Sequence, residues 1–458
     1  MGVSNLKDIY LADILSVVQG SLIKGNLNTI VKDAAYGLWD IKRDNTMYIH
    51  LDKRRGMNLH SIKSFKNMIY VSETPEEFFS LGDDISIIKV DNIREAYWKF
   101  VDYYRSLFSI PVIGVTGTCG KSTTTEMIKH IFSKRYKVCS TRNGNNALAF
   151  DFSYLLGIDD TTDAAVFEMG VDCPGDITYS CRHFKPQIRI LLNIGVYHIL
   201  GCKTLEGYIK AKSEILDTLD PDNGVLIISA EDENIKKIDI SKFKQVIHFG
   251  VSKNAEINAS DIKATKDGIT FILSYKGKNY RVNLPGLGKH NVYNAMAAIA
   301  AVTEIGMDIN EAIQGLKTYK PMAMHLELRE GPKGCTILDD NWNNTPPAML
   351  AALEVLQEIG KAKVKVAVFG QMYNLGTGPL ADEQYEKMGK KVVEAGVDIL
   401  VIIGDNPKEI GRKALELGMA KDKVFFIKNG TRVLNTLEPY LNDNVVLLLK
   451  ACEDNVTI

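Results

Sequence analysis

The sequence predicts an α/β protein of three domains, arranged around mostly parallel sheets. The chain has 458 residues, which at about 150 residues per domain corresponds to roughly three domains. From residue 110 onward, short apolar runs alternate with amphipathic stretches. A second series of the same kind begins near residue 335. Strands that alternate with helices in this way are typical of doubly wound sheets.

The elements can be assigned in chain order. Residues 1–104 form a mixed region, rich in Lys, Tyr and Ile, without a glycine-rich loop. In the central region, 105–318, we expect strands at residues 110–115, 164–167, 188–194 and 225–228, and helices at 122–132 and 205–219. Residues 269–275 and 280–284, separated by Lys276-Gly277-Lys278, predict a hairpin appended to the central sheet.

The third region, 319–458, predicts a Rossmann-like α/β domain. Its expected strands are residues 336–338, 364–369, 399–403, 424–427 and 445–449. The stretch 316–321 is the expected linker ahead of this series. The predicted domains are therefore 1–104, 105–318 and 319–458.

Composition excludes several classes of protein. Lys and Arg number 55, Asp and Glu number 56, and the net charge is -1, so no basic excess favours nucleic acid or an anionic membrane. No apolar run approaches the length of about 20 residues that spans a bilayer, and the first residues lack a signal-peptide core. The seven cysteines are scattered without a CxxC pair, which favours reduced thiols. We expect a cytoplasmic monomer that acts on small molecules.

The most specific motif is residues 114–122, which read Gly-Val-Thr-Gly-Thr-Cys-Gly-Lys-Ser. The segment follows a predicted strand and opens a predicted helix, so its amide groups and the helix dipole can bind phosphates. Lys121 can reach the β- and γ-phosphates of a nucleotide, and the Ser122 hydroxyl can bind Mg2+. The candidate ATP-binding residues of this loop are Gly117, Thr118, Cys119, Gly120, Lys121, Ser122 and Thr123.

Four further segments accompany the loop. Residues 168–170 read Glu-Met-Gly, 193–198 read Asn-Ile-Gly-Val-Tyr-His, 210–215 read Lys-Ala-Lys-Ser-Glu-Ile, and 288–295 read Gly-Lys-His-Asn-Val-Tyr-Asn-Ala. With the loop spacing Thr-Gly-Thr-x-Gly-Lys-Ser, this order resembles the Mur ligases, ATP-dependent amide-forming enzymes of peptidoglycan precursor synthesis. The resemblance covers almost the whole chain. It is strongest to the member that adds D-alanyl-D-alanine to a UDP-N-acetylmuramoyl-tripeptide.

The resemblance implies a catalytic set of Lys121, Glu168, His198 and Lys212. It also implies two Mg2+ ions, bound by Ser122, Glu168, His198 and a Lys212 that CO2 has converted to a carbamate. From the residues alone, Glu168 ends an apolar strand at the sheet edge where ligands bind. Lys212 alone would be an ordinary solvated lysine. In the implied reaction a carboxylate attacks the γ-phosphate of ATP, and an amine then attacks the resulting acyl phosphate.

Other implied contacts lie further along the chain. The resemblance assigns the nucleotide base to His290, Asn291 and Asn294, although these residues could simply cap the following Ala-rich helix. Segment 339–346, Asp-Asp-Asn-Trp-Asn-Asn-Thr-Pro, is similar to a family segment that closes on the nucleotide, but it is also rich in turn-forming residues. The implied contacts there are Asp340, Asn343 and the preceding His325. An Asn-rich substrate loop is matched by Asn143, Asn145 and Asn146.

Both substrate-binding ends depart from the family pattern. Asp40 stands where the family has an arginine near the uridine diphosphate, and Met324-His325 replaces Gly-Arg. Gln371 and Asn374 are neutral at two acidic positions. Residues 450–453 read Lys-Ala-Cys-Glu instead of Lys-Gly-Ser-Arg, and a final helix of the family is not expected before residue 458.

Alternatives therefore stay open. A Mur-type ligase could join a different carboxylate and amine, or the chain could be a non-catalytic nucleotide-binding relative. An oxidoreductase is disfavoured because the loop lacks Gly-x-Gly-x-x-Gly. A metal site at Cys173, Cys181 and His183 is less favoured than incidental thiols, because their spacing is not that of metal ligands.

Overall fold

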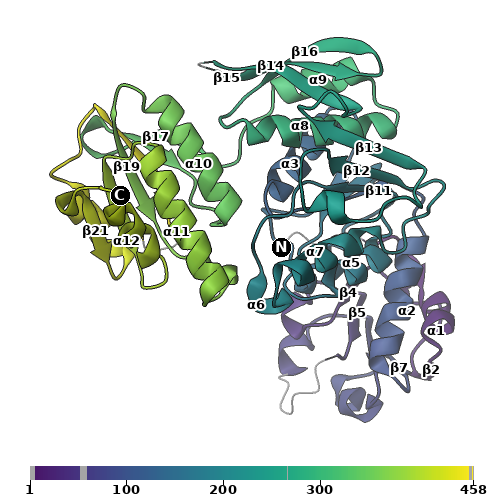
Figure 1. The fold of residues 1–458 in the computed structure, drawn as a ribbon. Coiled ribbons are helices and arrows are strands. Elements are labelled where there is room, and N and C mark those ends of the chain that lie inside the picture. Colours follow the sequence, from purple (N-terminus) through teal and green to yellow (C-terminus); the bar gives the residue numbers. More distant parts are fainter. Residues whose placement is uncertain (1–5, 52–58, 266, 453–455, 457–458) are drawn as a thin grey trace. The chain divides into compact units, whose positions relative to one another are not determined.

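The computed structural model describes residues 6–51, 59–265, 267–452 and 456 (Figure 1). These residues form two compact units, each assembled from several chain segments. The first unit takes in the described parts of 1–112, 136–165 and 182–185, and the second takes in 113–135, 166–181 and 186–458. The predicted α/β class with mostly parallel sheets is confirmed. The domain boundaries at residues 104 and 318 stay a prediction.

The first unit contains a five-stranded sheet with the order β2-β7-β6-β5-β4. Strands β4 to β7 are parallel to one another and β2 is antiparallel to β7. An aromatic cluster of Tyr48, Tyr70 and Phe78 forms part of its core. Its elements are β2 (Ser21–Lys24), β4 (Asp33–Ala35), β5 (Thr46–Ile49), β6 (Met68–Ser72), β7 (Ile85–Lys89), α1 (Leu11–Val18) and α2 (Ile93–Ser106).

The largest sheet has nine strands in the order β16-β15-β14-β13-β12-β11-β8-β10-β9. Strands β8, β11, β12 and β13 are parallel, so their carboxyl ends lie at one edge. Helix α8 (His290–Glu304) is buried along most of its length because its alanines allow close packing against the sheet and α3 (Lys121–Phe132). The strands are β8 (Val112–Thr116), β9 (Val138–Ser140), β10 (Ala164–Glu168), β11 (Ile188–Leu191), β12 (Val225–Ser229) and β13 (Gln245–Gly250).

The predicted hairpin is confirmed. Strands β15 (Gly268–Tyr275) and β16 (Lys278–Leu284) are antiparallel, and Tyr275 pairs with Lys278. The two connecting residues, Lys276 and Gly277, have φ angles of 48° and 74°. Left-handed conformations at both positions give the turn a twist that matches that of the paired strands. Strand β14 (Ile257–Thr265) joins this hairpin to β13.

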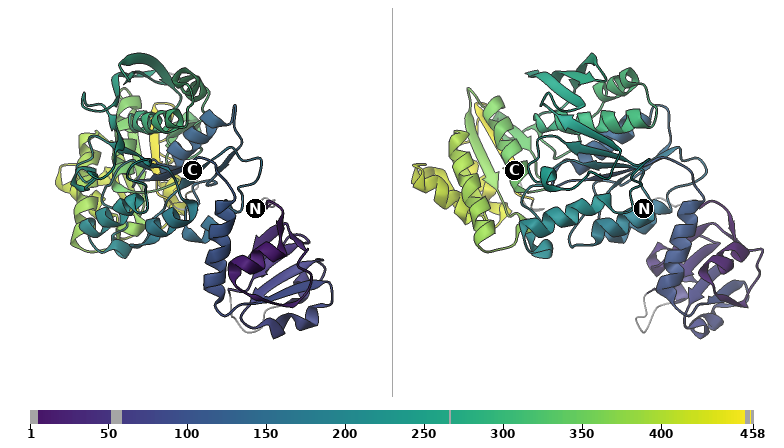
Figure 2. Two further views of the ribbon diagram at one scale, coloured as in Figure 1. Left: turned by 90° about the vertical axis from the view of Figure 1, so that its right-hand side faces the viewer. Right: turned by 45° about the vertical axis from the view of Figure 1, so that its right-hand side comes forward.

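The third predicted domain contains a six-stranded sheet with the order β17-β18-β22-β19-β20-β21. This part of the chain is drawn in green to yellow in Figure 2. All neighbours are parallel except β17 and β18. One core cluster joins Val366 and Val401 in the sheet to Val433 and Leu437 of α13. The elements are β17 (Glu327–Glu330), β18 (Thr336–Asp339), β19 (Val364–Phe369), β20 (Ile399–Ile403), β21 (Val424–Ile427), β22 (Val445–Lys450), α10 (Pro346–Ile359), α11 (Pro379–Glu394), α12 (Lys408–Glu416) and α13 (Val433–Leu437).

Three predicted boundaries were wrong. The helix expected at 205–219 ends earlier, as α7 (Leu205–Ser213) followed by a short 3-10 turn. The strand expected at 188–194 ends at Leu191, because the chain then turns into a loop at the sheet edge. The expected linker starts later than residue 316, since α9 (Ile309–Lys317) includes Leu316, which packs fully buried.

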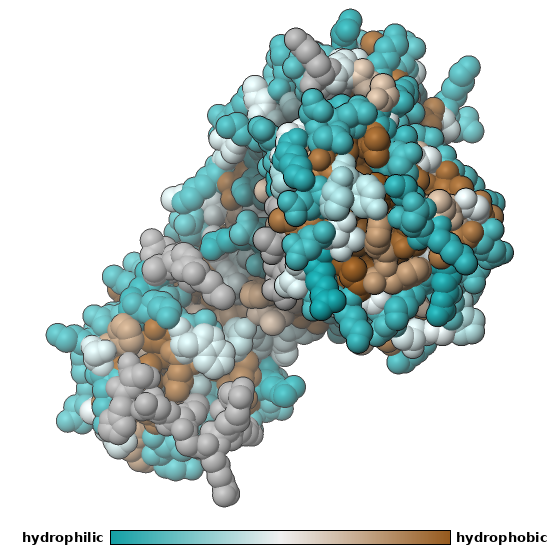
Figure 3. Space-filling view, turned by 90° about the vertical axis from the view of Figure 1, so that its left-hand side faces the viewer, coloured by the Kyte–Doolittle hydropathy of each residue, from teal (hydrophilic) through white to brown (hydrophobic). Residues whose placement is uncertain are grey.

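The surface is mostly polar on the face drawn in Figure 3, with apolar patches between the hydrophilic side chains. Among the described residues, no helix combines the length and the apolar character needed to cross a bilayer.

Candidate active site

The glycine-rich loop lies at the carboxyl end of β8, and α3 begins at Lys121, as the motif predicts. Gly120 has a φ of 84°, a left-handed conformation that L side chains rarely adopt. A Cβ atom at Gly120 would lie 2.4 Å from Oδ1 of Asn294. Glycine is therefore required at this position both by the backbone angle and by the space under the loop.

Asn193 fixes the loop from the neighbouring strand. Its Oδ1 accepts a hydrogen bond from the Cys119 amide at 2.9 Å, and its Nδ2 donates to the Cys119 carbonyl at 3.1 Å. Its backbone carbonyl accepts from the Thr118 amide at 2.9 Å. The Thr118 hydroxyl in turn accepts from the Gly195 amide at 2.8 Å. Asn193 was not among the predicted site residues, and the loop depends on it.

Lys121 and Ser122 open α3 on the phosphate-binding side of the loop. The Lys121 ammonium donates to the Gly117 carbonyl at 3.1 Å, so the side chain folds back over the loop. The Ser122 hydroxyl donates to Oε2 of Glu168 at 3.1 Å. Glu168 ends β10 and is buried. The predicted pair of Ser122 and Glu168 is thus brought together, with Thr123 following in the first turn.

His198 has the backbone conformation of a constrained residue. Its φ of 51° lies in the left-handed region, directly before α6 (Ile199–Cys202), and such a conformation costs about 1 kcal/mol for a non-glycine residue. Nδ1 of the ring lies 3.2 Å from Oδ1 of Asp172. This contact orients the imidazole and leaves Nε2 as its other ligating atom. Asp172 was not among the predicted residues.

Two lysines act on His198 electrostatically. Burial, followed by the positive charges of Lys212 and Lys121, lowers the pKa of His198 to about 3. The imidazole is therefore neutral near pH 7, the form that binds a metal.

Lys212 is not a solvated lysine, as the residues alone would suggest, but is only 1% exposed. Its Nζ donates to the Thr116 hydroxyl at 3.0 Å and lies 5.4 Å from the centre of the Tyr208 ring. Burial, followed by the charge of Lys121, holds the pKa of Lys212 well below its usual range. A neutral amine is nucleophilic, whereas an ammonium is not.

A metal ion at this sheet edge would be bound by a mixture of ligand types. Among the described residues, no three His, Cys, Asp or Glu side chains converge into a metal cluster. A cation here would therefore need hydroxyl, phosphate or modified lysine oxygens beside Glu168 and His198.

The predicted base-binding residues lie inside the helix that begins at residue 290. They do not precede it, as capping residues would. His290, Asn291 and Asn294 all lie in α8, and its N-cap, Lys289, makes no side-chain capping bond. The capping interpretation was therefore wrong. Nδ2 of Asn291 donates to the Leu287 carbonyl at 2.7 Å, and Nδ2 of Asn294 donates to Oδ1 of Asn291 at 3.0 Å. These amides support the floor of the loop.

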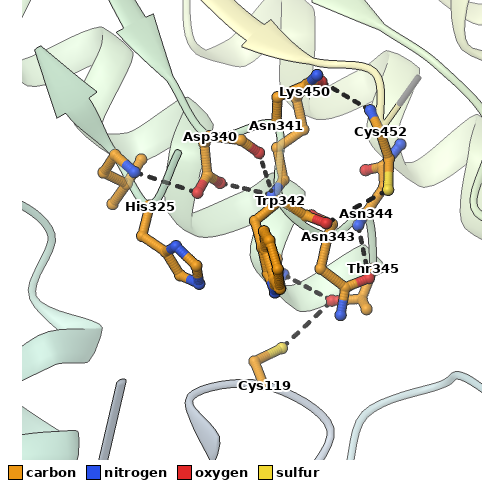
Figure 4. Close-up of polar contacts among 12 residues, drawn as sticks. Cys119, His325, Asp340, Asn341, Trp342, Asn343, Asn344, Thr345, Lys450 and Cys452 are labelled. Carbon is orange, nitrogen blue, oxygen red and sulfur yellow. Dashed lines mark hydrogen bonds and ion pairs between the residues drawn. The ribbon is translucent and has the colours of Figure 1, made fainter. Parts of the chain in front are cut away.

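The loop after β18 is held by an ion pair between the buried Lys450 and the largely buried Asp340 (Figure 4). Nζ of Lys450 lies 2.6 Å from Oδ2 of Asp340 and also donates to the carbonyls of Asp340 and Asn343. Oδ1 of Asp340 accepts from the Leu326 amide at 3.2 Å. Both carboxylate oxygens are thus engaged within the third domain. Asp340 fixes the loop, and Asn343 contributes its backbone.

The same loop approaches the glycine-rich loop. Thr345 caps α10 through the Ala348 amide, and its hydroxyl lies 3.2 Å from the Cys119 sulfur. Burial lowers the pKa of His290 to about 4. The charges of Asp340, which raises this pKa, and of Lys450, which lowers it, act on the same ring. The predicted residues of the central and third regions are therefore brought together here.

His325 is neutral rather than a replacement for a charged arginine. Burial lowers its pKa, and its Nδ1 donates to the Ala323 carbonyl at 2.8 Å. The ring stacks on Trp342 with a centroid separation of 5.8 Å. Met324 has a φ of 56°, the conformation that the glycine of the family pattern would adopt without strain.

The predicted substrate loop belongs to the first unit. Asn143 and Asn145 are exposed and Asn146 is partly buried. The Asn145 carbonyl accepts from the Tyr154 hydroxyl at 2.9 Å. In the same unit, burial raises the pKa of Asp40. Glu453, one of the predicted departures from the family pattern, lies outside the described residues.

Comparison with known proteins decides the family. Residues 115–302 match the Mur ligase middle domain, and residues 326–452 match the Mur ligase glutamate ligase domain. The chain is 30% identical to the UDP-N-acetylmuramoyl-tripeptide–D-alanyl-D-alanine ligase of Bacillus subtilis, over 80% of this chain and 78% of that protein. The chain belongs to the Mur ligase family.

Solved structures agree on the fold. MurF from Acinetobacter baumannii superposes with a TM-score of 0.84 at 24% identity, over 98% of this chain and 97% of that one. MurF ligase from Thermotoga maritima, solved in complex with ADP, gives a TM-score of 0.75 at 20% identity over 92% and 93% of the two chains. The three-domain class with a central P-loop domain, predicted from the sequence, is that of the Mur ligase fold.

Proposed function

We propose that this Mur ligase uses ATP to join D-alanyl-D-alanine to a UDP-N-acetylmuramoyl-tripeptide-like carboxylate. The observation that carries the proposal is the convergence of Lys121, Glu168, His198 and Lys212 at one sheet edge beside the glycine-rich loop. The likeness to the Bacillus subtilis ligase, over most of both chains, supports the choice of substrates.

The loop suits the triphosphate of ATP. Its amides precede an α-helix whose N-terminus favours negative charge. The Lys121 side chain, which lies over the loop, supplies the charge that a γ-phosphoryl group needs during transfer.

The donor set also suits magnesium. Glu168 and Ser122 offer hard oxygen atoms, and neutral His198 offers a nitrogen. When bound there, Mg2+ would neutralise charge that develops on the transferred phosphoryl group.

Lys212 fits the proposed carbamate. A neutral amine can attack CO2 at carbon, losing one proton and gaining a carboxylate-like group. The change turns a buried base beside the cation Lys121 into an anion, which removes the repulsion between the two lysine side chains. Tyr208, whose hydroxyl lies 3.2 Å from the Thr118 hydroxyl, walls the same space.

The reaction then follows in two steps. A carboxylate oxygen of the acid substrate attacks the γ-phosphorus of ATP, the bond to ADP breaks, and an acyl phosphate forms. The amine nitrogen attacks the acyl carbon, loses a proton, and displaces inorganic phosphate. Lys121 stabilises the transferred charge, and the loop of Asp340 and Thr345 beside Cys119 helps to exclude water.

A second candidate keeps this chemistry and changes both substrates. It is favoured by Asp40, a carboxyl with a raised pKa in place of an arginine, and by neutral His325, Gln371 and Asn374. At these positions a diphosphate would lack the arginine of the family pattern, and an ammonium would lack the acidic side chains.

Phosphate release by the purified full chain with ATP and Mg2+ tests both candidates. UDP-N-acetylmuramoyl-tripeptide and D-alanyl-D-alanine are supplied together and then singly. Release only with both supports the first candidate. ATP binding without release in any combination contradicts it and favours other substrates.

A further inference from the structure

Two cysteines lie on the two segments that follow Glu168 and His198. Cys173 comes five residues after Glu168, and Cys202 ends α6, four residues after His198. Cys173 is exposed and Cys202 is buried, and both are free thiols. Both belong to the second unit of the chain.

The contacts between these segments are reciprocal. The Cys202 sulfur lies 4.0 Å from the carbonyl oxygen of Asp172, the residue before Cys173. The Cys173 sulfur lies 3.2 Å from the position that a Cβ on Gly201, the residue before Cys202, would occupy. Each sulfur therefore approaches the backbone next to the other cysteine.

The close approach depends on Gly201. A Cβ there would lie 1.7 Å from the Asp172 carbonyl oxygen, so any other residue would force the two backbones apart. A disulfide requires Cα atoms separated by about 4.4–6.8 Å, which only closely packed backbones provide. The Asp172 and Cys173 amides both donate to Asp176 at 2.8 Å, which fixes one side of the pair.

We propose that Cys173 and Cys202 form a reversible intramolecular disulfide when the protein meets a low-molecular-weight disulfide. The exposed Cys173 thiolate attacks one sulfur of the small disulfide, forming a mixed disulfide and releasing one small thiolate. The Cys202 thiolate then attacks the Cys173 sulfur and releases the second. Two protein thiols are oxidised, the reagent is reduced to two thiols, and the two protons pass to the released thiolates.

The disulfide would also affect the active site. Only this effect on catalysis rests on the proposed function. The disulfide would tie together the segments that carry Glu168 and His198, and His198 already contacts Asp172. Disulfide formation itself is measured without ATP, substrates or Mg2+, so its failure is distinguishable from failure of the ligase assignment.

The test is exposure of the reduced full chain to oxidised glutathione under native conditions, followed by alkylation, proteolysis and mass spectrometry. We expect a peptide linked through Cys173 and Cys202. The free thiols should fall from seven by two, to five, and dithiothreitol should restore them. In Cys202→Ser, glutathione should remain attached to Cys173, because no resolving thiol is present.

The matched control is Cys139→Ser, which lies in the first unit and should still lose two thiols. Stable glutathione on Cys173 of the unsubstituted protein would overturn the proposal. A link from Cys173 to another cysteine, or seven unchanged thiols, would overturn it equally.

Discussion

At the scale of single residues, burial changes what the candidate side chains can do. Lys212 appears in the sequence among other lysines, and nothing in its neighbours indicates that it is 1% exposed. Its environment comes from β8 and α7, through Thr116 and Tyr208. The sequence could therefore name Lys212 through resemblance, but the lowered pKa of its amine follows only from long-range packing.

Lys121 provides the sharpest test of the phosphate-binding loop. We expect Lys121→Ala to lower ATP consumption by at least about 100-fold, because a charge aimed at the transferred phosphoryl group is lost. Steady-state phosphate release measures the effect, with circular dichroism as a check of folding. Lys129→Ala, which removes a lysine two turns along the same helix, should retain activity. Undiminished turnover in Lys121→Ala would exclude the assignment.

Carbamylation of Lys212 can be detected directly. With 13C-labelled bicarbonate, we expect a carbamate carbon signal in the NMR spectrum of the protein, because burial lowers the pKa of the Lys212 amine well below its usual range and so favours its nucleophilic, neutral form. Lys212→Arg should lack the signal, since a guanidinium stays protonated. A spectrum of the unsubstituted protein without this signal would contradict the proposed modification.

Substitution of Gly120 tests the steric fit under the loop. The control glycine has the same left-handed backbone but no neighbouring atoms. Gly120→Ala should weaken ATP binding at least about 10-fold, because a Cβ would meet Asn294 at 2.4 Å in a left-handed backbone. Gly277→Ala is the matched control, since its φ is 74° and no atom lies within 4 Å of its Cβ position. Calorimetric titration with ATP compares them. Equal affinities would show that the loop tolerates the side chain.

At the scale of elements, the strands of the third domain were the easiest to predict. The bounds of β19, β20 and β21 coincide with the predicted ranges, because continuous apolar runs end where buried strands end. Helix α7 was predicted too long. The Glu214 carboxylate after it accepts from the amides of Gly175 and Thr178, and these partners, 36 or more residues away, redirect the chain.

Site elements were harder to assign than the scaffold. The strand ends predicted which loops meet at the sheet edge, because parallel strands share that edge. Asn193 and Asp172 were missed because each acts through a loop partner, Cys119 or His198, that no local pattern indicates. The segment 193–198, which begins with Asn193 and contributes to the family resemblance, is the signal that could have identified this residue.

The ion pair of Asp340 and Lys450 tests how the third-domain loop is held. Lys450→Met should lower the free energy of unfolding by about 3 kcal/mol, because it leaves the largely buried Asp340 carboxylate without its charged partner. Adding Asp340→Asn should recover part of the loss. Urea unfolding measures both variants.

The control for this pair is Lys413→Met. Lys413 forms an exposed pair with Glu416 in the same domain, and its substitution should leave the unfolding curve unchanged. Equal effects of Lys413→Met and Lys450→Met would contradict the role assigned to Lys450.

At the scale of the whole molecule, the two compact units differ in what they contribute. The second unit carries the glycine-rich loop and the loop of Asp340, whereas the first carries Asp40 and Asn145. The glycine-rich loop follows the family pattern, whereas departures from it occur in both units, at Asp40 in the first and at His325 and Gln371 in the second. This division explains why the reaction class is better supported than the identity of the acid substrate.

The first unit should be sensitive to acid. Burial lowers the pKa of His183, which stacks on Trp98 at 3.9 Å, to about 4. Unfolded, the ring has a pKa of about 6.5, so the unfolded state binds a proton first as pH falls. Stability is therefore complete above pH 6.5 and is lost between about pH 6.5 and 4.

We expect this residue to reduce the free energy of unfolding by about 2 kcal/mol between pH 7.5 and pH 5. His183→Phe keeps an aromatic ring beside Trp98 and removes the titration. Urea unfolding followed by tryptophan fluorescence at the two pH values gives the difference. Identical pH dependence in the two proteins would contradict the prediction.

Because the first unit is assembled from separate segments of the chain, its folding depends on the order in which they are synthesised. Residues 182–185 belong to that unit, and Phe184 accepts a hydrogen bond from Arg105 at 2.9 Å through its carbonyl. A ribosome that has just added residue 112 has therefore synthesised most of the unit, but not yet its segments 136–165 and 182–185. Final folding of this unit must wait until residue 185 has left the exit tunnel, by which time part of the nucleotide site has already been synthesised.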